Sequence, residues 1–477
     1  MPSGPDFPIA RARTLFLIAT LTGLSTLLFI SEYLKSGRVC DHVYFSKAVL
    51  KGRGFRPRFS IRLILTKLAL TNRPIGYLQV KKLKYALVHE WLTPLATGGS
   101  ELVVQEILKH VDEADVYALI DFESANPESY LFGRQIGTTF LQHFPKARSG
   151  VQKYLPLLPI AIEQLDLREY DILLSSSHAV AKGILSSPQQ LHVCYCHTPM
   201  RYAWDLTFDY LRSSQAGRGI PGLLTRYLLH RLRQWDVISA NRVDYFIANS
   251  QHTARRIWRC YRRRAEVIYP PVNIERFSLM RQKQDFYVTV CRLVSYKNVS
   301  AIVQAFNQLG HTLIVIGTGP ELEMIRLLAK PNVQVLGWQP ASIVEKYMAE
   351  AKAFVYAACE DFGIALVEAQ ACGTPVISYA AGGALETVLD IRQHPETGTG
   401  LFFSSQTTAA LVEPVEEFEQ LQDKFEPESC RLRAQQFAPE VFGQRYLAFV
   451  ERCYQEFQSR DFCTKSGNGE SVRGSEW

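Results

Sequence analysis

Two glutamates flank a glycine in the segment CEDFGIALVEAQACGTPVIS, which is otherwise apolar enough for a protein core. Glu360 comes before Gly363, and Glu368 follows Glu360 after eight residues. Residues 365–371 favour a helix, and a glycine and a proline shortly after them end it. We therefore predict Glu360 in the loop that enters a helix and Glu368 inside that helix. The N–H groups at such a helix start suit an anion, although acids are also common there without a site.

Two cations and a glycine loop precede these glutamates in the chain. Arg292 and Lys297 belong to VCRLVSYKN, between an apolar run and a predicted helix, and Gly317 belongs to GTGPE at the end of the next apolar run. Glycines let a backbone approach a ligand closely. Two cations, glycine loops and a helix N-terminus at one sheet edge are features of a pyrophosphate site. Acids beside a diphosphate would accept hydrogen bonds from sugar hydroxyls. Solvated loop residues are the alternative for the two cations.

The elements that must position these residues form two series of apolar runs separated by helical segments. Runs that end in small or polar residues predict a parallel, doubly wound sheet that binds ligands at the carboxyl ends of its strands. The first series comprises residues 84–91, 115–121, 170–178, 192–199 and 243–250, and the second comprises 285–293, 311–321, 333–338, 353–359 and 375–379. The prolines of residues 267–277 predict a stiff connection. The fold class is therefore α/β, with two Rossmann-like domains facing a cleft.

This pattern divides the chain into five segments. A hydrophobic and basic extension precedes the first domain. An amphipathic helix with the apolar stripe Val441, Tyr446, Leu447 and Val450 follows the second and is expected to pack back on the body. The polar tail is expected to be disordered. The predicted segments are 1–83 for the extension, 84–266 and 267–430 for the two domains, 431–458 for the helix and 459–477 for the tail.

The extension carries a hydrophobic stretch, residues 14–30, behind Arg11 and Arg13. Its length is at the short limit for a membrane span. A membrane anchor is the preferred interpretation. The alternatives are an upstream extension that is absent from the cellular protein and a cleaved secretory signal, although no small-x-small cleavage site follows. Basic residues crowd the next stretch. Because Lys and Arg concentrate on the cytoplasmic side, we predict a cytoplasmic, membrane-associated body.

Charge is distributed unevenly along the 477 residues. The formal net charge is +7, but residues 1–84 hold 15 Lys or Arg and 3 Asp or Glu, so the rest has 38 basic and 43 acidic residues. A mildly acidic body argues against nucleic acid as its main partner. The ten cysteines do not form two pairs at zinc-site spacing. They are interpreted as reduced core residues of a cytoplasmic protein.

The motifs, in this order, resemble those of retaining glycosyltransferases of the GT-B fold, the glycosyl transferases group 1 family. The resemblance rests on R-x(4)-K at 292–297 followed by E-x(7)-E at 360–368, and it covers residues 84–455. Three further stretches agree with it: Gly98-Gly99, Asn249-Ser250 and CYCHTPMRYAWD at 194–205. The last of these resembles a subgroup that transfers mannose in bacterial surface-polysaccharide assembly.

The resemblance implies a role for each matching residue. Arg292 and Lys297 would bind the diphosphate of a nucleotide-sugar in the second domain, and Glu360 would hold hydroxyls of the donor sugar. The first domain would receive the acceptor. The other implied donor contacts are the N–H groups near Phe362 and Gly363 beside the sugar, Glu368 on the ribose, Gly99 and Gly317 in the glycine loops, and His197 over the sugar near its anomeric carbon.

The resemblance also implies a retaining transfer of a hexose, with mannose from GDP-mannose as the leading donor, to a lipid-linked or polysaccharide acceptor. No D-x-D signature occurs in the chain, so no metal or other cofactor is expected. Same-face attack is favoured because no matched carboxylate serves as nucleophile. A UDP-sugar donor is the first alternative. A non-catalytic nucleotide-sugar-binding subunit at a membrane is an alternative of another class.

Several residues near these motifs stay open between a structural and a functional role. Asp361 is interpreted as an acid at a helix start. The arginines of residues 255–264 are interpreted as a solvated face or as a patch for anionic lipid. Arg201, Tyr202 and Trp204 are assigned equally to packing and to acceptor recognition.

Overall fold

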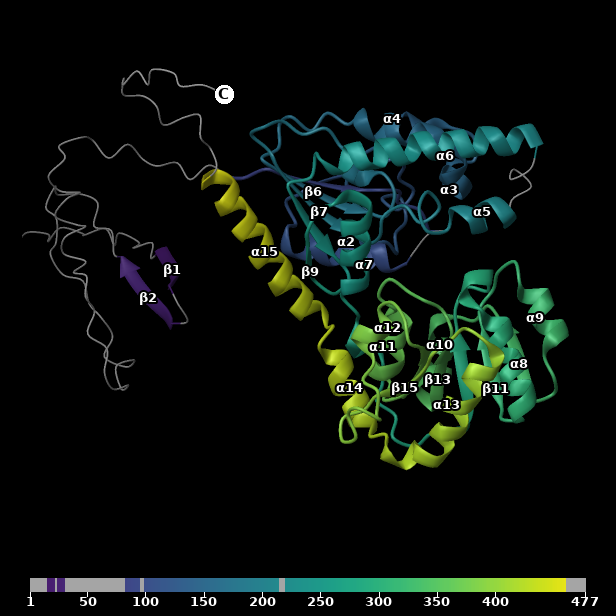
Figure 1. Ribbon diagram of the computed structural model, residues 1–477. Helices are drawn as coiled ribbons and strands as arrows, with labels where there is room; N and C mark the ends of the chain where they lie inside the picture. Colours follow the sequence, from purple (N-terminus) through teal and green to yellow (C-terminus); the bar gives the residue numbers. More distant parts are fainter. Residues whose placement is uncertain (1–14, 22–23, 31–81, 95–97, 214–218, 460–477) are drawn as a thin grey trace, which may run out of the picture. The chain divides into compact units, whose positions relative to one another are not determined.

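The computed structural model describes residues 15–21, 24–30, 82–94, 98–213 and 219–459 (Figure 1). Near the N-terminus, β1 (Leu15–Leu21) and β2 (Leu24–Ile30) pair antiparallel, with Leu15 opposite Ile30. The candidate anchor at 14–30 falls on these strands, and no helix among the described residues is both long and apolar enough to cross a membrane. Residues 31–81 of the predicted extension and the tail from 460 on lie outside the described residues. The anchor therefore stays a prediction.

The first domain is built on a parallel sheet with the strand order β5-β4-β3-β6-β7-β8-β9. Its strands are β3 (Tyr85–His89), β4 (Asp115–Ala118), β5 (Ile136–Gly137), β6 (Ile172–Ser177), β7 (Leu191–Cys196), β8 (Tyr245–Ala248) and β9 (Ala265–Val267). The central strand β3 pairs on both sides, with Leu87 opposite Val116 and Leu174. The five predicted runs correspond to strands of this sheet, whereas the short strands β5 and β9 were not predicted.

The second domain repeats the plan with the order β12-β11-β10-β13-β14-β15, all pairs parallel. Its strands are β10 (Gln284–Val290), β11 (Leu313–Ile316), β12 (Val333–Gly337), β13 (Ala351–Tyr356), β14 (Val376–Tyr379) and β15 (Gly400–Phe403). The predicted runs correspond to the first five of these. The edge strand β15 was not predicted. Two Rossmann-like domains are therefore confirmed.

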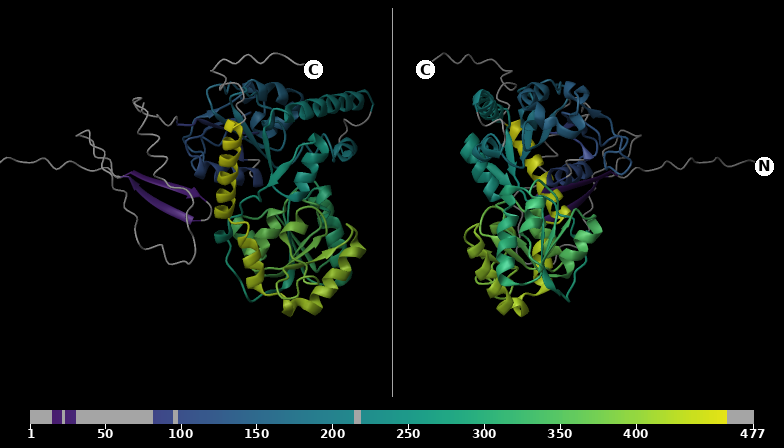
Figure 2. Two further views of the ribbon diagram at one scale, coloured as in Figure 1. Left: turned by 60° about the vertical axis from the view of Figure 1, so that its left-hand side comes forward. Right: turned by 90° about the vertical axis from the view of Figure 1, so that its right-hand side faces the viewer.

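Helices cover both faces of each sheet (Figure 2). In the first domain they are α2 (Gly99–His110), α3 (Ala147–Gly150), α4 (Leu158–Glu163), α5 (Thr207–Ser213), α6 (Gly219–Ala240) and α7 (Gln251–Tyr261). In the second they are α8 (Val299–Leu309), α9 (Leu322–Leu328), α10 (Ala341–Glu350), α11 (Ile364–Ala371), α12 (Ala384–Thr387), α13 (Thr408–Leu421) and α14 (Pro427–Gln435).

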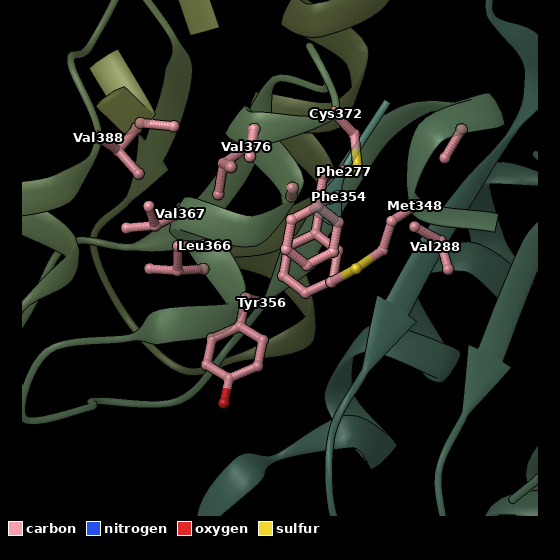
Figure 3. Packing of buried hydrophobic residues seen from close by; sticks show 14 of the residues in the cluster. Phe277, Val288, Met348, Phe354, Tyr356, Leu366, Val367, Cys372, Val376 and Val388 are labelled. Carbon is pink, nitrogen blue, oxygen red and sulfur yellow. The ribbon is translucent and has the colours of Figure 1, made fainter. Parts of the chain in front are cut away.

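One core of the second domain fixes α11 against the sheet. Phe354 of β13 and Val376 of β14 pack with Leu366 and Val367 of α11 (Figure 3). These side chains are buried, because helices cover both faces of a parallel sheet and leave successive strand residues without solvent contact. The loop before α11, which carries Glu360, is therefore held by a rigid support.

The last helix, α15 (Pro439–Ser459), returns to the first domain (Figure 1). Its side chains pack in the core that also contains Val103 and Val104 of α2. The buried positions are Phe442, Tyr446, Phe449, Val450 and Cys453. The predicted stripe was wrong for Val441 and Leu447, each 37% exposed. The larger aromatic residues define the buried face instead.

Candidate active site

A cavity of about 490 Å³ opens between the two domains, beyond the carboxyl ends of their central strands. Most of the predicted site residues line it. Those from the first domain are Gly99 and His197, and those from the second are Arg292, Lys297, Glu360, Phe362 and Gly363. The structure thus brings these seven residues together from four separate stretches of the chain. Gly317 and Glu368 lie away from its walls.

Lys297 and Glu360 form an ion pair in the cavity wall, and Tyr356 contacts both. The ammonium of Lys297 lies 2.5 Å from the Tyr356 hydroxyl, which donates to Glu360 Oε1 at 3.0 Å. Burial, together with the charge of Glu360, raises the pKa of Tyr356 well above its usual value, so this phenol stays protonated. Lys297 and Glu360 were predicted to bind different parts of a ligand, but in the structure they contact each other.

Arg292 lies in the cavity wall with an exposed side chain. Among residues 82–94, 98–213 and 219–459, no carboxylate forms an ion pair with this guanidinium. A cation without a carboxylate partner, beside a cavity, can bind an anionic ligand without first breaking an ion pair.

Gly317 packs against the backbone next to Arg292 and does not line the cavity. Its φ of +141° is rare for residues with a side chain, and an added Cβ would lie 1.8 Å from the carbonyl oxygen of Cys291. Only glycine therefore permits the end of β11 to approach the end of β10 so closely. The predicted donor contact of Gly317 stays a prediction.

The first turn of α11 faces the cavity. Phe362, Gly363, Ile364 and Ala365 all line the cavity, and Gly363 adopts a left-handed φ of +89° directly before the helix. First-turn N–H groups have no partner within their own helix and carry partial positive charge. This end of α11 and Arg292 therefore supply two sources of positive charge to one cavity.

Gly99 brings the first domain against this helix start. A Cβ at Gly99 would lie 2.5 Å from Cδ1 of Ile364 in the second domain. A larger residue at position 99 would therefore require the Ile364 side chain to shift. The glycine loop predicted after the first strand is thus a point of contact between domains.

Glu368 lies on α11 but outside the cavity wall. It is half-buried, and burial raises the pKa of its carboxyl, while the charge of Arg276 lowers it and that of Glu345 raises it. Glu360 lies in the loop before α11 and lines the cavity, whereas Glu368 lies inside the helix and does not. The ribose contact predicted for Glu368 stays a prediction.

His197 follows β7 and is neutral in its surroundings. Burial lowers its pKa well below the usual value, and the neighbouring His178 and His89 lower it further. Its backbone oxygen accepts a hydrogen bond from Asn249 Nδ2 at 3.0 Å. The imidazole is thus held in the cavity wall as an uncharged group.

A chain of polar contacts, which we call the histidine relay (Glu101, His89, Ser176 and His197), determines which nitrogen of His197 carries the proton. Ser176 Oγ lies 2.8 Å from His197 Nε2 and 3.1 Å from His89 Nδ1, which is also 3.1 Å from the backbone oxygen of Ser176. A carbonyl oxygen only accepts, so His89 Nδ1 must carry a proton. With that tautomer, the Ser176 hydroxyl accepts from His89 and keeps its own proton to donate to His197 Nε2. We therefore predict the tautomer of His197 that carries its proton on Nδ1.

Glu101 connects this relay to the glycine loop. Glu101 Oε1 lies 3.6 Å from His89 Nε2, while its Oε2 accepts from the Gly98 N–H at 2.8 Å and from the Ser100 hydroxyl at 2.9 Å. Burial alone would raise the pKa of Glu101, but His89 and Ser100 bring it down to about 2. The ionised carboxylate of Glu101 thus contacts both the glycine loop, at Gly98 and Ser100, and the imidazole of His89.

Ser176→Ala should remove the preference of His197 for one neutral tautomer. The change removes the only donor in the relay that faces His197 Nε2, so we expect a mixture of the two neutral tautomers in place of one. NMR of the ring nitrogens in histidine-labelled protein measures this directly. Ser175→Ala is the matched control, because Ser175 Oγ makes the same 2.8 Å contact with Nε2 of buried His192. Unchanged His197 resonances in Ser176→Ala protein would contradict the relay.

Asp361 links the two domains beside the cavity. Its carboxylate lies 2.7 Å from Arg256 Nη1 and 2.9 Å from Arg201 Nη2, and Arg256 Nη2 lies 2.5 Å from Asp205. The Arg256 side chain is only 10% exposed, so its assignment to a solvated face was wrong. The reason is that α7 turns this residue toward the loop before α11. The cross-domain partners of Asp361 were not predicted.

Trp204 packs inside the first domain. Its Nε1 donates to Asp236 at 2.8 Å, and Asp236 also pairs with the buried Lys182 and accepts from Tyr261 at 2.9 Å. Because a buried carboxylate accepts the hydrogen bond of its indole N–H, Trp204 belongs to the core of the first domain. The packing alternative therefore holds for Trp204, whereas Arg201 faces the cavity region through Asp361.

Sequence reasoning missed several polar residues of the site, in particular His89, Ser176 and Tyr356. Each stands at the carboxyl end of a central strand, where ligand-binding residues of doubly wound sheets are expected. A polar residue at that position was therefore an available signal. Most of their partners could not be found in the same way, because His197 lies 21 residues from Ser176, Ser176 lies 87 from His89 and Lys297 lies 59 from Tyr356.

Two family models match the two domains in succession. Glycosyltransferase Family 4 matches residues 97–276, and Glycosyl transferases group 1 matches residues 273–436. The boundary between the matched ranges falls in the predicted connection at 267–277.

Curated relatives resemble part of the chain. A GDP-mannose-dependent alpha-(1-6)-phosphatidylinositol monomannoside mannosyltransferase of Mycolicibacterium smegmatis is 31% identical over 155 residues, which cover 26% of this chain and 41% of that protein. A GDP-mannose-dependent monoacylated alpha-(1-6)-phosphatidylinositol monomannoside mannosyltransferase of Corynebacterium glutamicum is 31% identical over 178 residues, 31% of this chain and 47% of that protein. The chain thus spans less than half the length of either relative that it matches.

A solved structure, Anabaena Alr3699/HepE in complex with UDP-glucose, has the same fold. The TM-score is 0.55 at 20% identity, and the match covers 78% of this chain and all of that chain. This similarity concerns the arrangement of two Rossmann-like domains around a cleft. The chain thus has the GT-B fold, and its second domain matches the glycosyl transferases group 1 family over residues 273–436.

Proposed function

We propose that the protein is a retaining glycosyltransferase that moves mannose from GDP-mannose to a lipid-linked or polysaccharide acceptor. The observation that carries the proposal is the cavity between the domains. The cavity is lined by the neutral His197, by the N-terminus of α11 and by Arg292, which forms no ion pair with a carboxylate of the described residues. Such a cavity suits a ligand that combines a diphosphate with an uncharged sugar.

The diphosphate is the leaving group in this proposal. Breaking a glycosyl–phosphate bond builds negative charge on the diphosphate and positive charge on the sugar. Arg292, Lys297 and the N–H groups at the start of α11 stabilise the negative charge. Glu360 holds sugar hydroxyls, and Tyr356 keeps its carboxylate oriented. The proposed ribose contact of Glu368 rests on the resemblance of the sequence motif.

Same-face attack is supported by the state of the cavity carboxylates. Glu360 pairs with Lys297, and Asp361 pairs with Arg201 and Arg256, so both acids that line the cavity are engaged by cations. A carboxylate nucleophile would have to leave its partner first. We therefore propose that the acceptor attacks on the face of the leaving group and that a phosphate oxygen takes its proton. His197 donates from Nδ1 toward the sugar.

GDP-mannose is the preferred donor because the names of both relatives describe GDP-mannose-dependent mannosyltransferases. The second candidate is a UDP-sugar, which the UDP-glucose complex of HepE favours. The acceptor is proposed to be carried by a membrane on the cytoplasmic side, with which the protein associates.

The test is release of nucleotide from GDP-mannose and from UDP-glucose, each with and without EDTA. We expect GDP release that is unaffected by EDTA, because fixed cations occupy the role that a metal ion has in other transferases. Faster release of UDP would establish the second candidate. Loss of activity that magnesium or manganese restores would overturn the metal-independent part of the proposal, and absence of release from both donors would overturn the transferase.

A further inference from the structure

Helix α6 is apolar on two opposite faces. One face carries Leu229 and Leu232, which are buried against the first domain. The other carries side chains at three- and four-residue steps, which places them in one stripe. This outer face consists of Ile220, Leu223, Leu224, Tyr227, Leu228 and Ile238, which are between 36% and 83% exposed. A helix that is amphipathic toward the core has no need of such a second stripe.

Basic residues accompany the outer face of α6. Residues 219–235 contain Arg226, Arg231 and Arg233 and no Asp or Glu. Arg226 and Arg231 are exposed, and on the adjacent α5 the ring of Phe208 is 70% exposed. Outside the N-terminal extension the chain is mildly acidic, so this concentration of cations is local.

Two classes of partner could cover an exposed apolar stripe of this size. A second copy of the chain would pack α6 against itself across a twofold axis, which would bring the arginines of both copies together. Like charges at an interface disfavour that arrangement. An anionic lipid surface takes the leucines into its acyl boundary and pairs the arginines with its headgroups. The charge pattern therefore favours lipid.

We propose that the outer face of α6, with Arg226 and Arg231, docks the protein on an anionic lipid surface. The proposal rests on the proposed function in one respect, because it supplies the means by which a membrane-borne acceptor meets the cavity. Residues 201–204 connect the docking helix to the cavity. Trp204 donates to Asp236 of α6, and Arg201 pairs with Asp361 in the cavity wall.

The experiment adds vesicles of phosphatidylcholine, with or without phosphatidylglycerol, to the full chain. We expect vesicles that contain phosphatidylglycerol to slow hydrogen exchange in residues 219–231. Leu223→Glu with Leu224→Glu should abolish this protection and lower the partition coefficient at least ~10-fold, since a buried leucine is replaced by a charge at two positions. Arg226→Gln should lower partition onto anionic vesicles about 5-fold and leave partition onto neutral vesicles unchanged.

The matched control is Leu327→Glu, which alters an 89% exposed leucine on α9 of the second domain. It should leave both protection and partition unchanged. If residues 14–30 also hold the chain on vesicles, the double variant keeps its bound fraction but still loses protection of 219–231, which supports the proposal.

Absence of protection in the unaltered chain overturns the proposal, and so does an equal effect of Leu327→Glu. Protection of 219–231 that depends on protein concentration and not on vesicles would assign the face to a second copy. Donor hydrolysis without vesicles should be equal in all these variants. If hydrolysis is absent throughout while vesicle protection is present, the proposed function fails and the docking surface stands.

Discussion

Lys297→Met should lower the rate of donor cleavage about 10³-fold, or about 4 kcal/mol. The change removes a cation that stabilises charge on the leaving diphosphate. It also leaves the carboxylate of Glu360 in the cavity wall without its ion-pair partner, where it repels the diphosphate. Single-turnover kinetics with GDP-mannose measure the effect. Lys297→Arg keeps the charge and should retain more of the rate.

A second lysine of the same domain provides the control for this result. Lys352 pairs with Glu419 at 2.6 Å, and the Tyr287 hydroxyl donates to the same carboxylate at 2.5 Å, so the three residues repeat the Lys297, Glu360 and Tyr356 arrangement outside the cavity. Lys352→Met should lower the melting temperature without lowering the rate of folded protein. Equal losses of rate in both variants would show that the cavity lysine acts only on stability.

Glu360→Gln should lower kcat about 10²-fold, or about 2.7 kcal/mol, while Glu368→Gln should raise KM for the donor. Glu360 lies in the cavity and is assigned to the sugar, whose charge changes in the transition state, so its loss acts on turnover. Glu368 is assigned to the ribose, which changes little. Steady-state kinetics and calorimetric binding of GDP distinguish the two roles.

Glu419→Gln is the control for both substitutions, because Glu419 accepts from a lysine and a tyrosine as Glu360 does but lies outside the cavity. It should leave kcat and KM unchanged. Intact turnover with lost GDP binding in Glu360→Gln would reverse the two assignments. If neither cavity nor helix glutamate changes the kinetics, both acids only occupy a helix start.

Most of the fold could be predicted because strands in a parallel sheet are buried on both faces. Residues such as 172–174 or 353–355 are continuously apolar for that reason, and their runs stand out in the sequence. The strands that were missed, β5, β9 and β15, lie toward the edges of their sheets and have two to four residues each. A run of two or three residues, as in β5 and β9, leaves no periodic pattern, whereas β15 is as long as the predicted β4, β8, β11 and β14.

Residues that line the cavity were predictable where a local motif marks them. Arg292, Glu360 and Gly363 stand at strand ends or at a helix start, which the sequence marks with charges and glycine. The contacts between distant segments were not predictable in this way. Neither the pairing of Arg256 with Asp361 nor that of Ser176 with His197 leaves a trace in local spacing, since each depends on how separate elements pack.

Neighbouring residues of one loop, Glu360 and Asp361, face different partners. Glu360 belongs to the cation pair of the second domain, and Asp361 is held by Arg201 and Arg256 of the first. One peptide bond therefore joins the acid that we propose binds the sugar to the ion pairs of Asp361 between the domains. A rotation that opens the cleft must therefore stretch the ion pairs of Asp361 and displace Glu360 at the same time. With Glu360 on the donor sugar as proposed, donor binding favours domain closure, and domain closure favours donor binding to the same extent. Because these side chains are only 10% to 22% exposed, added salt should weaken this connection between the domains less than it weakens a surface ion pair.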